Sequence, residues 1–166
     1  MAQMNFCPYC GSELKSAVID AKERRMCSRE GCPYVFWDNP TPVVAALVEY
    51  QGELVLARNK SWPEGLFGLI TGFLEKGETP EQAVAREVKE ELGLDAAGVD
   101  FIGVYAFEQM NQLIVAYHVV AGMGGMTLGE ELAEVKILPP EQVKPWDFGT
   151  GLAVRDWLNR SRMSRF

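Results

Sequence analysis

Three glutamates in one short stretch are the residues whose type and spacing point most directly to chemistry. Glu87, Glu90 and Glu91 lie in GFLEKGETPEQAVAREVKEELGL, residues 72–94. At about 100° per residue of an α-helix, their side chains fall within an arc of about 100°. Like charges this close repel by roughly 0.2–0.5 kcal/mol per pair on an isolated helix. A solvated acidic face is the alternative, but the neighbouring glycines and apolar stripe favour a hard-cation site for Mg²⁺ or Mn²⁺.

The cysteines form a second set of potential metal ligands, because all four lie within the first 32 residues as two close pairs, Cys7 with Cys10 and Cys27 with Cys32. Two such pairs, sixteen residues apart, are typical of a zinc ribbon, although the second pair has four intervening residues where two are commoner. So short a segment buries little core, so a metal would supply the missing stability. Disulfide bonds between these cysteines are an alternative, but they are rare in cytosolic proteins. Iron is an alternative to zinc, because it also binds four cysteine sulfurs in a tetrahedron. We expect structural Zn²⁺, because four protein ligands leave no open position.

The glutamates require a helix, and the residues around them predict one. Thr79 is a good N-cap, Pro80 suits the first helical position, and Gln82 can complete a capping box. Gly93 is a typical helix stop. The helical arc beside the glutamates is apolar and should pack on a sheet, so the carboxylates stand at the edge of any cleft; this arc consists of Val84, Ala85, Val88 and Leu92.

Strand-like segments precede and follow the predicted helix. Residues 43–50 and 53–58 flank Gln51-Gly52, a plausible hairpin turn, and a short apolar strand ends near Thr71. Further strands are predicted at 99–108, 112–122 and 133–138, with a final helix from about residue 149 to residue 159. Residues 37–42, WDNPTP, read as a linker. This order predicts an α/β (α+β) fold with a mixed sheet, divided into residues 1–38 and 39–166.

The composition of the chain limits the kinds of partner and the cellular location that we expect. The 166 residues carry a net charge of −7, which argues against a nucleic-acid partner because phosphates would be repelled. No run approaches about eighteen apolar residues, so we expect no membrane span. The N-terminus lacks a basic segment followed by an apolar stretch, so a cytoplasmic location is expected.

The segment 72–94 matches the Nudix box without a departure: Gly72, five residues, Glu78, seven residues, then REVKEELGL. The chain therefore resembles the Nudix hydrolases. The Cys-x-x-Cys ribbon with an Asn-Pro linker, EQMNQLIVAYHV after the box, and KPWDFGTGLAVRDWL near the end are similar to zinc-ribbon members that act on FAD or ADP-ribose.

The resemblance implies an α/β/α sandwich preceded by a small zinc ribbon. It implies hydrolysis of the diphosphate linkage of a small nucleotide by a metal-activated water. Glu87, Glu90 and Glu91 would hold Mg²⁺ or Mn²⁺, joined by the backbone carbonyl of Gly72. Gly72 would also give the loop before the helix its turns, as would Gly77.

The resemblance assigns roles to the other charged residues near the box. Arg86 would orient Glu87 or Glu90 through a bidentate pair. Glu78 would bind the loop backbone or a water beside the metal. The general base is either Glu90 or a carboxylate of LGEELAEVKIL, where Glu134 matches the family position best and Glu130 and Glu131 are the other candidates.

Several residues outside the box have a functional and a structural interpretation. Trp62, Tyr105 and Phe107 could stack on an adenine or flavin ring, or could fill a core. Asn111 and Gln112 resemble family positions near the substrate, but side-chain amides in a turn are an equal alternative. The single histidine, His118, lies in an apolar strand and is expected to be structural.

Two other functions compete with hydrolysis of FAD or ADP-ribose. One is cleavage of NADH or NAD-capped RNA, a subgroup marked by a Ser-Gln-Pro-Trp-Pro-Phe-Pro array that is missing between Leu94 and Ala121. The other is a non-catalytic regulator that binds a nucleotide, against which the intact box argues. Many similar proteins are homodimers, so the resemblance leaves a homodimer open.

Overall fold

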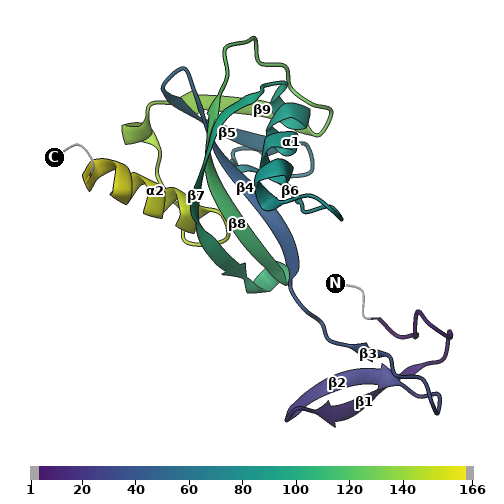
Figure 1. Ribbon diagram of the computed structural model, residues 1–166. Coiled ribbons are helices and arrows are strands. Elements are labelled where there is room, and N and C mark those ends of the chain that lie inside the picture. Colours follow the sequence, from purple (N-terminus) through teal and green to yellow (C-terminus); the bar gives the residue numbers. More distant parts are fainter. Residues whose placement is uncertain (1–3, 164–166) are drawn as a thin grey trace. The chain divides into compact units, whose positions relative to one another are not determined.

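The computed structural model describes residues 4–163, and the chain divides into two compact units, one up to Asn39 and one from Pro40 onward. The smaller unit contains a three-stranded antiparallel sheet in the order β1-β2-β3 (Figure 1). These strands are β1 (Leu14–Ile19), β2 (Lys22–Cys27) and β3 (Val35–Phe36). The core of this unit centres on three buried side chains, Cys7, Leu14 and Cys27. So small a core needs another source of stability.

The larger unit is built on a six-stranded sheet in the order β7-β8-β4-β5-β9, with β6 paired to β4. Strands β4 and β8 run parallel, whereas the other pairs are antiparallel, so the predicted mixed sheet is confirmed. The strands are β4 (Thr41–Tyr50), β5 (Glu53–Asn59), β6 (Ile70–Phe73), β7 (Ala96–Phe107), β8 (Gln112–Ala121) and β9 (Leu132–Leu138).

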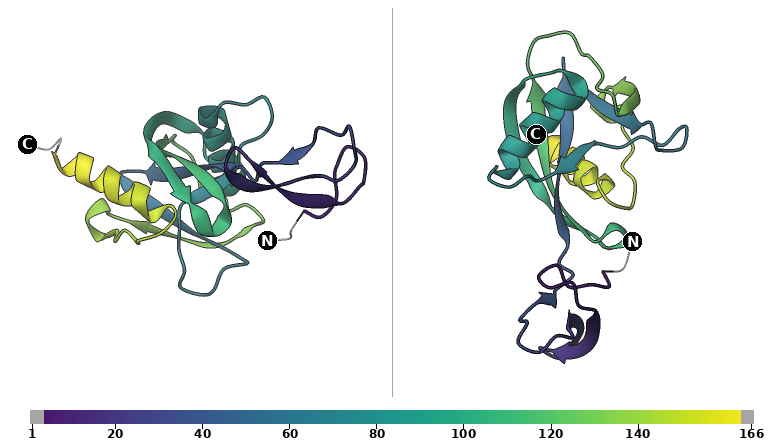
Figure 2. Two further views of the ribbon diagram at one scale, coloured as in Figure 1. Left: turned by 90° about the horizontal axis from the view of Figure 1, so that it is seen from below. Right: turned by 90° about the vertical axis from the view of Figure 1, so that its right-hand side faces the viewer.

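A helix covers each face of this sheet. Helix α1 (Pro80–Leu92) and helix α2 (Gly151–Met163) lie on opposite sides of the strands in Figure 1 and in the right-hand view of Figure 2. The apolar stripe of α1 packs into one core cluster and that of α2 into the other. Burying a Val or Leu side chain completely stabilises the fold by about 1.5–3 kcal/mol. The structure thus confirms the predicted α/β/α sandwich.

Local sequence signals determine the turn between β4 and β5 and the two ends of helix α1. Gln51 and Gly52 both have positive φ, 54° and 85°, as the predicted tight hairpin turn between β4 and β5 requires. Helix α1 begins with the predicted capping box between Thr79 and Gln82. It ends at Gly93, whose φ of 70° is a left-handed C-cap.

Three predicted boundaries differ from the structure. The expected linker 37–42 is too long, because β4 already begins at Thr41, whose backbone N–H donates to the Asn111 carbonyl at 2.8 Å. Strand β7 begins at Ala96 rather than Val99. Helix α2 begins later and ends later than predicted, since the backbone turns at Gly149, where φ is 51°.

Two short 3-10 helices, Glu108–Met110 and Pro140–Gln142, complete the described secondary structure. Within residues 4–163, each helix is too short or too polar to cross a membrane.

Candidate functional site

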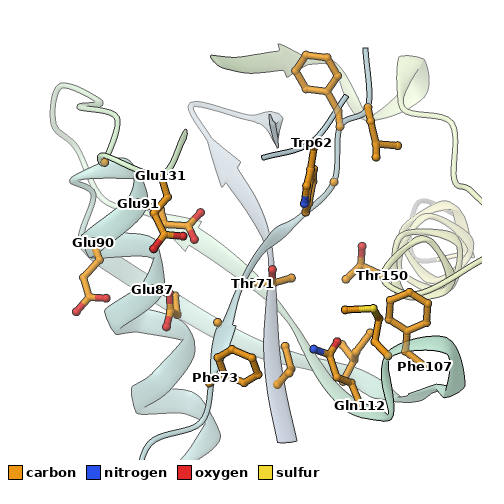
Figure 3. A pocket seen from close by; sticks show the side chains of 18 of the residues that line it. Trp62, Thr71, Phe73, Glu87, Glu90, Glu91, Phe107, Gln112, Glu131 and Thr150 are labelled. Atoms are coloured by element: carbon orange, nitrogen blue, oxygen red, sulfur yellow. The ribbon is translucent and has the colours of Figure 1, made fainter. Parts of the chain in front are cut away.

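A cavity of about 810 Å³ lies in the larger unit, with acidic side chains on one side and aromatic side chains on another. Figure 3 shows Glu87, Glu90 and Glu91 of α1 beside Glu131, across from Phe107 and Thr150. We call Glu87, Glu90, Glu91 and Glu131 the carboxylate end. The structure therefore brings the three predicted helix glutamates to one cavity, which Glu130 and Glu131 of the loop before β9 and Glu75 of the loop before α1 also line.

Arg86 holds the carboxylates in place from the adjoining side of α1. Its Nη1 donates to Glu87 Oε1 at 2.6 Å and to Glu90 Oε2 at 3.1 Å. Its Nε and Nη2 donate to the two carboxylate oxygens of Glu78 at 3.2 and 2.8 Å. The bidentate pair that was expected with Glu87 or Glu90 is therefore made with Glu78, and Glu87 and Glu90 each receive one hydrogen bond.

Glu78 connects this network to the loop before α1. Its Oε1 accepts a hydrogen bond from the backbone N–H of Glu75 at 2.6 Å, and its hydrogen bonds with Arg86 lower the pKa of its carboxyl. Arg86 also donates from Nη2 to the Phe73 carbonyl at 3.1 Å. Of the two contacts expected for Glu78, the structure shows the one to the loop backbone.

Gly72 is needed for space rather than for a turn. It lies within β6 opposite Val44, and it is Gly77 that has the positive φ, 95°. A Cβ at Gly72 would lie 1.9 Å from Cδ of Glu87. Any larger residue would displace the Glu87 carboxyl, so the expected role of Gly72 in shaping the loop is corrected to close packing.

The carboxylate end is electrostatically strained without a cation. Burial raises the pKa of Glu87, and the charges of Glu90 and Glu131 raise it further against the opposing effect of Arg86. Burial, followed by the charges of Glu87, Glu131 and Glu90, raises the pKa of Glu91 to about 7. Partly buried carboxylates that repel one another are a donor set that fits a hard divalent cation such as Mg²⁺ or Mn²⁺.

The loop that follows β8 carries Glu131 to this end. The Gly129 N–H donates to the Glu91 carbonyl at 2.8 Å, and a Cβ at Gly129 would lie 2.6 Å from the Glu90 carbonyl oxygen. This close packing against α1 brings both Glu130 and Glu131 to the cavity wall. The charge of Glu131 is close enough to raise the pKa of Glu91.

Glu134 lies elsewhere. It is in β9 opposite Arg58 of β5, and its Oε1 accepts a hydrogen bond from Arg58 Nε at 2.7 Å. Glu134 is not among the described residues that line the cavity. Of the three loop carboxylates considered, the structure places Glu131, and not Glu134, among the carboxylates of α1.

The expected aromatic residues separate into two groups. Trp62 and Phe107 line the cavity, and the ring of Trp62 lies against Gly68, where a Cβ would come within 3.0 Å of it. Tyr105 instead donates to Asp156 at 2.7 Å, away from the cavity lining. His118 pairs with Glu49 at 2.9 Å and lies outside the lining of this cavity, although both residues line a second cavity of about 500 Å³.

Phe148 and Thr150 are among the cavity residues that sequence reasoning missed. They lie in WDFGTG, where the sequence predicts the start of a helix within the longer segment that resembles zinc-ribbon members. The flanking glycines were the available signal: Gly149 has a φ of 51°, and a Cβ at Gly151 would lie 2.0 Å from the Trp146 carbonyl oxygen. Such crowding marks a tight turn rather than ordinary helix.

In the smaller unit, the Sγ atoms of the four cysteines lie within 4.8 Å of one another, and all four are free thiols. Sγ of Cys10 is 3.5 Å from that of Cys27, and Sγ of Cys7 is 3.8 Å from that of Cys32. Edges of about 3.8 Å are expected for a tetrahedron with Zn–S bonds of about 2.3 Å. Hydrogen bonds from Ser12 lower the pKa of Cys10 to about 6, while burial raises that of Cys27. This closed set of soft donors fits Zn²⁺.

Comparison with known proteins agrees with this geometry. The chain is 30% identical over 132 residues to the NAD-capped RNA hydrolase NudC of Vibrio atlanticus, which covers 80% of the chain and 47% of that protein. It is 32% identical over 122 residues to the NAD-capped RNA hydrolase NUDT12 of Homo sapiens, covering 69% of the chain and 26% of that protein. The chain thus spans less than half the length of either relative.

The fold is also found in a solved structure. A NUDIX hydrolase from Nitrosomonas europaea superposes with a TM-score of 0.79 over 96% of this chain and 93% of that one, at 22% identity. At this identity the likeness shows the fold alone. The family model of the NUDIX domain matches residues 39–156. The chain therefore belongs to the NUDIX family, as the residue pattern at 72–94 predicts.

Proposed function

We propose that this protein hydrolyses the diphosphate linkage of a nucleoside diphosphate derivative, of the FAD or ADP-ribose type, with the help of Mg²⁺ or Mn²⁺. The observation that carries the proposal is the carboxylate end itself. Its four carboxylates lie on one side of a cavity of about 810 Å³, which is large enough for a nucleotide, and aromatic rings line another side. A solvated acidic face would not place Glu87 with a side chain only 12% exposed.

The residues present fit a hard cation. Glu87, Glu90 and Glu91 would hold it, together with the Gly72 carbonyl. A divalent cation bound there would neutralise phosphate oxygens and make water a better nucleophile. It would also remove the repulsion that raises the pKa of Glu91.

The protein's own groups position the reactants and move the proton. Arg86 fixes Glu87 and Glu90 at hydrogen-bond distance, so it is a positioning residue. In the reaction, a water oxygen forms a bond to one phosphorus while the bond from that phosphorus to the bridging oxygen breaks. Two phosphate monoesters are released. We assign the proton of the attacking water to Glu131, in place of Glu134, with Glu90 as the alternative acceptor.

NAD-capped RNA is a second candidate substrate, because the two curated relatives described above carry that name. The missing Ser-Gln-Pro-Trp-Pro-Phe-Pro array and the acidity of the chain weigh against it. Residues 1–39 hold five Lys and Arg and five Asp and Glu, so the net charge of −7 falls wholly on residues 40–166. An RNA chain would therefore meet less repulsion from the smaller unit.

We further propose that the four cysteines hold one structural Zn²⁺, which supplies the stability that the small core lacks. A cytoplasmic location, where thiols stay reduced, suits four free cysteines.

Direct assay of the purified full chain tests the proposed reaction. FAD, ADP-ribose, NADH, NAD-capped RNA and a DNA fragment are each incubated with the protein and Mg²⁺. Hydrolysis that is lost in Glu91→Gln but retained in Glu141→Gln, an exposed control outside the cavity lining, supports the proposal. Tight binding of a nucleotide without turnover in the unmodified protein would instead favour a regulator.

A further inference from the structure

Glu131 is held at the cavity by contacts that differ from those of the helix glutamates. Arg86 donates to both Glu87 and Glu90, whereas Glu131 comes from the loop before β9 and is exposed. Fixing an exposed side chain of this length costs up to about 2 kcal/mol of rotamer entropy. A general base must nevertheless stay within hydrogen-bond reach of the water that it deprotonates. The residue that holds Glu131 in place therefore bears on the reaction.

The carboxyl of Glu131 accepts a hydrogen bond from Asn59, the last residue of β5. Nδ2 of Asn59 lies 3.4 Å from Oε2 of Glu131, and hydrogen bonds of catalytic groups are often this long before the substrate binds. The same amide is also fixed from its other end. Its Oδ1 accepts from the backbone N–H of Ser61 at 2.9 Å and from the Ser61 hydroxyl at 2.8 Å. Because Oδ1 faces these two donors, the NH₂ group is turned toward Glu131.

An irregularity in the pairing of β5 with β9 brings these two residues together. In regular antiparallel pairing Asn59 would lie opposite Ala133, but a register shift places it opposite Leu132. Ala133 is therefore the extra residue of a β-bulge, a feature that often redirects side chains beside active sites. Beyond the bulge, the backbone N–H of Lys60 donates to the Glu131 carbonyl at 2.8 Å. The bulge thus moves Glu131 one position closer to Asn59 than regular pairing would.

The group that holds Glu131 carries no charge. Lys60, the cation of the same turn, directs its ammonium group to the carbonyl of Glu130 and not to the Glu131 carboxyl. A neutral amide orients a carboxylate without offsetting its negative charge, which a group that accepts a proton has to keep. Arg86, by contrast, places a positive charge on Glu87 and Glu90, which are proposed to bind the cation. The two kinds of support suit two different tasks.

We propose that Asn59 is a positioning residue, which holds the carboxyl of Glu131 at the cavity wall where that group accepts the proton of the attacking water. This inference rests on the proposed function, in which Glu131 has that role. Asn59 is not among the described residues that line the cavity, so it acts through Glu131 and not on the substrate. Loss of its amide should therefore lower kcat and leave KM nearly unchanged.

Asn59 also shapes the turn after β5, and one substitution separates this role from the positioning of Glu131. Its backbone carbonyl accepts from the Trp62 N–H at 2.9 Å, and its Oδ1 accepts from Ser61. Asn59→Asp keeps an acceptor for Ser61, as Asp does in turns of this kind. It replaces the NH₂ group with a carboxylate oxygen, which repels Glu131. Asn59→Ala removes the acceptor and the donor together.

Steady-state kinetics with ADP-ribose and saturating Mg²⁺, together with thermal unfolding, provide the main test. Asn59→Asp should lower kcat by roughly 10–100-fold, because a displacement of about 1 Å at a reacting group costs up to about a hundredfold. Its KM should change by less than about threefold, and its Tm should be that of the unmodified chain. Asn159→Asp adds the same charge at an exposed position of α2 outside the cavity lining, and it should have unmodified kinetics. If Asn59→Asp is fully active and Asn59→Ala alone is impaired, Asn59 is structural and the inference is overturned.

A double-mutant cycle shows whether Asn59 acts through Glu131. Glu131→Gln by itself should lower kcat by about 10²–10⁴-fold, the usual contribution of a general base. In that background Asn59→Asp should change kcat by less than about twofold, since the effects of two groups that work as a unit do not add. Losses that multiply in the double variant would show that the two residues act independently, and would overturn the inference.

The contact itself can be observed without activity. The side-chain amide signal of Asn59 in a ¹H–¹⁵N NMR spectrum is identified by its loss in Asn59→Asp, and it should shift in Glu131→Gln but not in Glu141→Gln. If no diphosphate is hydrolysed but the signal shifts in this way, the proposed function fails and the contact stands. If ADP-ribose is hydrolysed but Glu131→Gln leaves the signal unmoved, or Asn59→Asp leaves kcat unchanged, the inference is wrong and the proposed function stands.

Discussion

The cysteine cluster and the carboxylate end are two sets of four side chains, each proposed to bind a metal ion, and their arrangements are opposite. The four thiols lie within 4.8 Å of one another around a small core, and together they would supply every ligand of the proposed tetrahedral zinc ion. The carboxylates instead line one wall of a cavity, and their exposure varies from 12% for the Glu87 side chain to 58% for that of Glu90. The comparison teaches that a set of ligands that fills every coordination position of an ion stabilises the fold. A set that leaves positions unfilled has room for a reactant.

The surroundings of the two sets match this division. The thiols are packed with Leu14, Tyr34 and Phe36 and are not among the residues that line the cavity of the larger unit. The carboxylates share their cavity with aromatic rings and a neutral amide, a lining that suits the organic part of the proposed nucleotide substrate. Stability should therefore depend on the cysteines, and activity on the glutamates.

Cys27→Ser should produce the largest effect, and it should be an effect on stability. Apparent free energies of structural zinc binding are about 10–16 kcal/mol, more than a core of this size can replace. We expect about one zinc ion per chain in the unmodified protein and loss of protection from hydrogen exchange in β1 and β2 of the variant. Elemental analysis and exchange mass spectrometry measure both. A zinc-free chain with these strands still protected would contradict the structural role.

Glu87→Gln should have the reverse result, with the fold retained and activity lost. Removing one preorganised electrostatic group of an active site typically lowers kcat by about 10²–10³-fold. The half-buried position of Glu87 against Gly72 leaves no room for another carboxylate to replace it. Steady-state kinetics with ADP-ribose measure the loss, and thermal unfolding measures the fold. Glu141→Gln provides the control, and equal rates for the two variants would exclude Glu87 from the site.

Gly72→Ala should cause a smaller loss of the same kind. The added methyl group would lie within 2 Å of the Glu87 carboxyl and must displace it. Displaced supporting contacts around a metal ligand typically cost about 10–100-fold in metal affinity. Calorimetric titration with Mg²⁺ measures this effect. Gly124→Ala, at a position where a Cβ meets nothing within 4 Å, should bind Mg²⁺ normally.

The pH dependence of stability should be the smallest effect. Burial and neighbouring charges raise the pKa of Glu91 from 4.5 to about 7. The folded chain therefore holds this proton longer than the unfolded chain, so stability without Mg²⁺ should fall as pH rises from about 4.5 to about 7. Mg²⁺ should raise Tm more at pH 8 than at pH 5.5. At pH 8 Glu91 is already ionised, so binding the cation displaces no proton from it. In Glu91→Gln the difference between the Mg²⁺-induced rises in Tm at the two pH values should shrink. If it is unchanged, groups other than Glu91 cause the pH dependence.

The contrast between the two sets also explains what the sequence could predict. Ligands close together in the chain, such as Cys7 with Cys10 or Glu87 with Glu91, are visible because spacing alone sets their geometry. The cap at Thr79 and the stop at Gly93 are equally local. These signals located α1 and the carboxylates correctly on one face.

Features that depend on tertiary contacts could not be predicted in the same way. Glu131 and Glu134 are three residues apart, and only the pairing of β9 with β5 sends Glu134 to Arg58. The close approach of Gly72 to Glu87 requires β6 to pack on α1. The ring pair of Phe107 and Phe148 at the cavity wall joins residues 41 positions apart in the sequence, so no local pattern reveals it.

The most direct test measures Mn²⁺ binding by electron paramagnetic resonance together with ADP-ribose hydrolysis in the same samples, for the unmodified chain and Glu91→Gln. If the carboxylate end binds the catalytic cation, affinity for Mn²⁺ should fall by at least about tenfold in the variant, and hydrolysis should fall with it. Unchanged Mn²⁺ affinity with unchanged hydrolysis in Glu91→Gln would contradict the account.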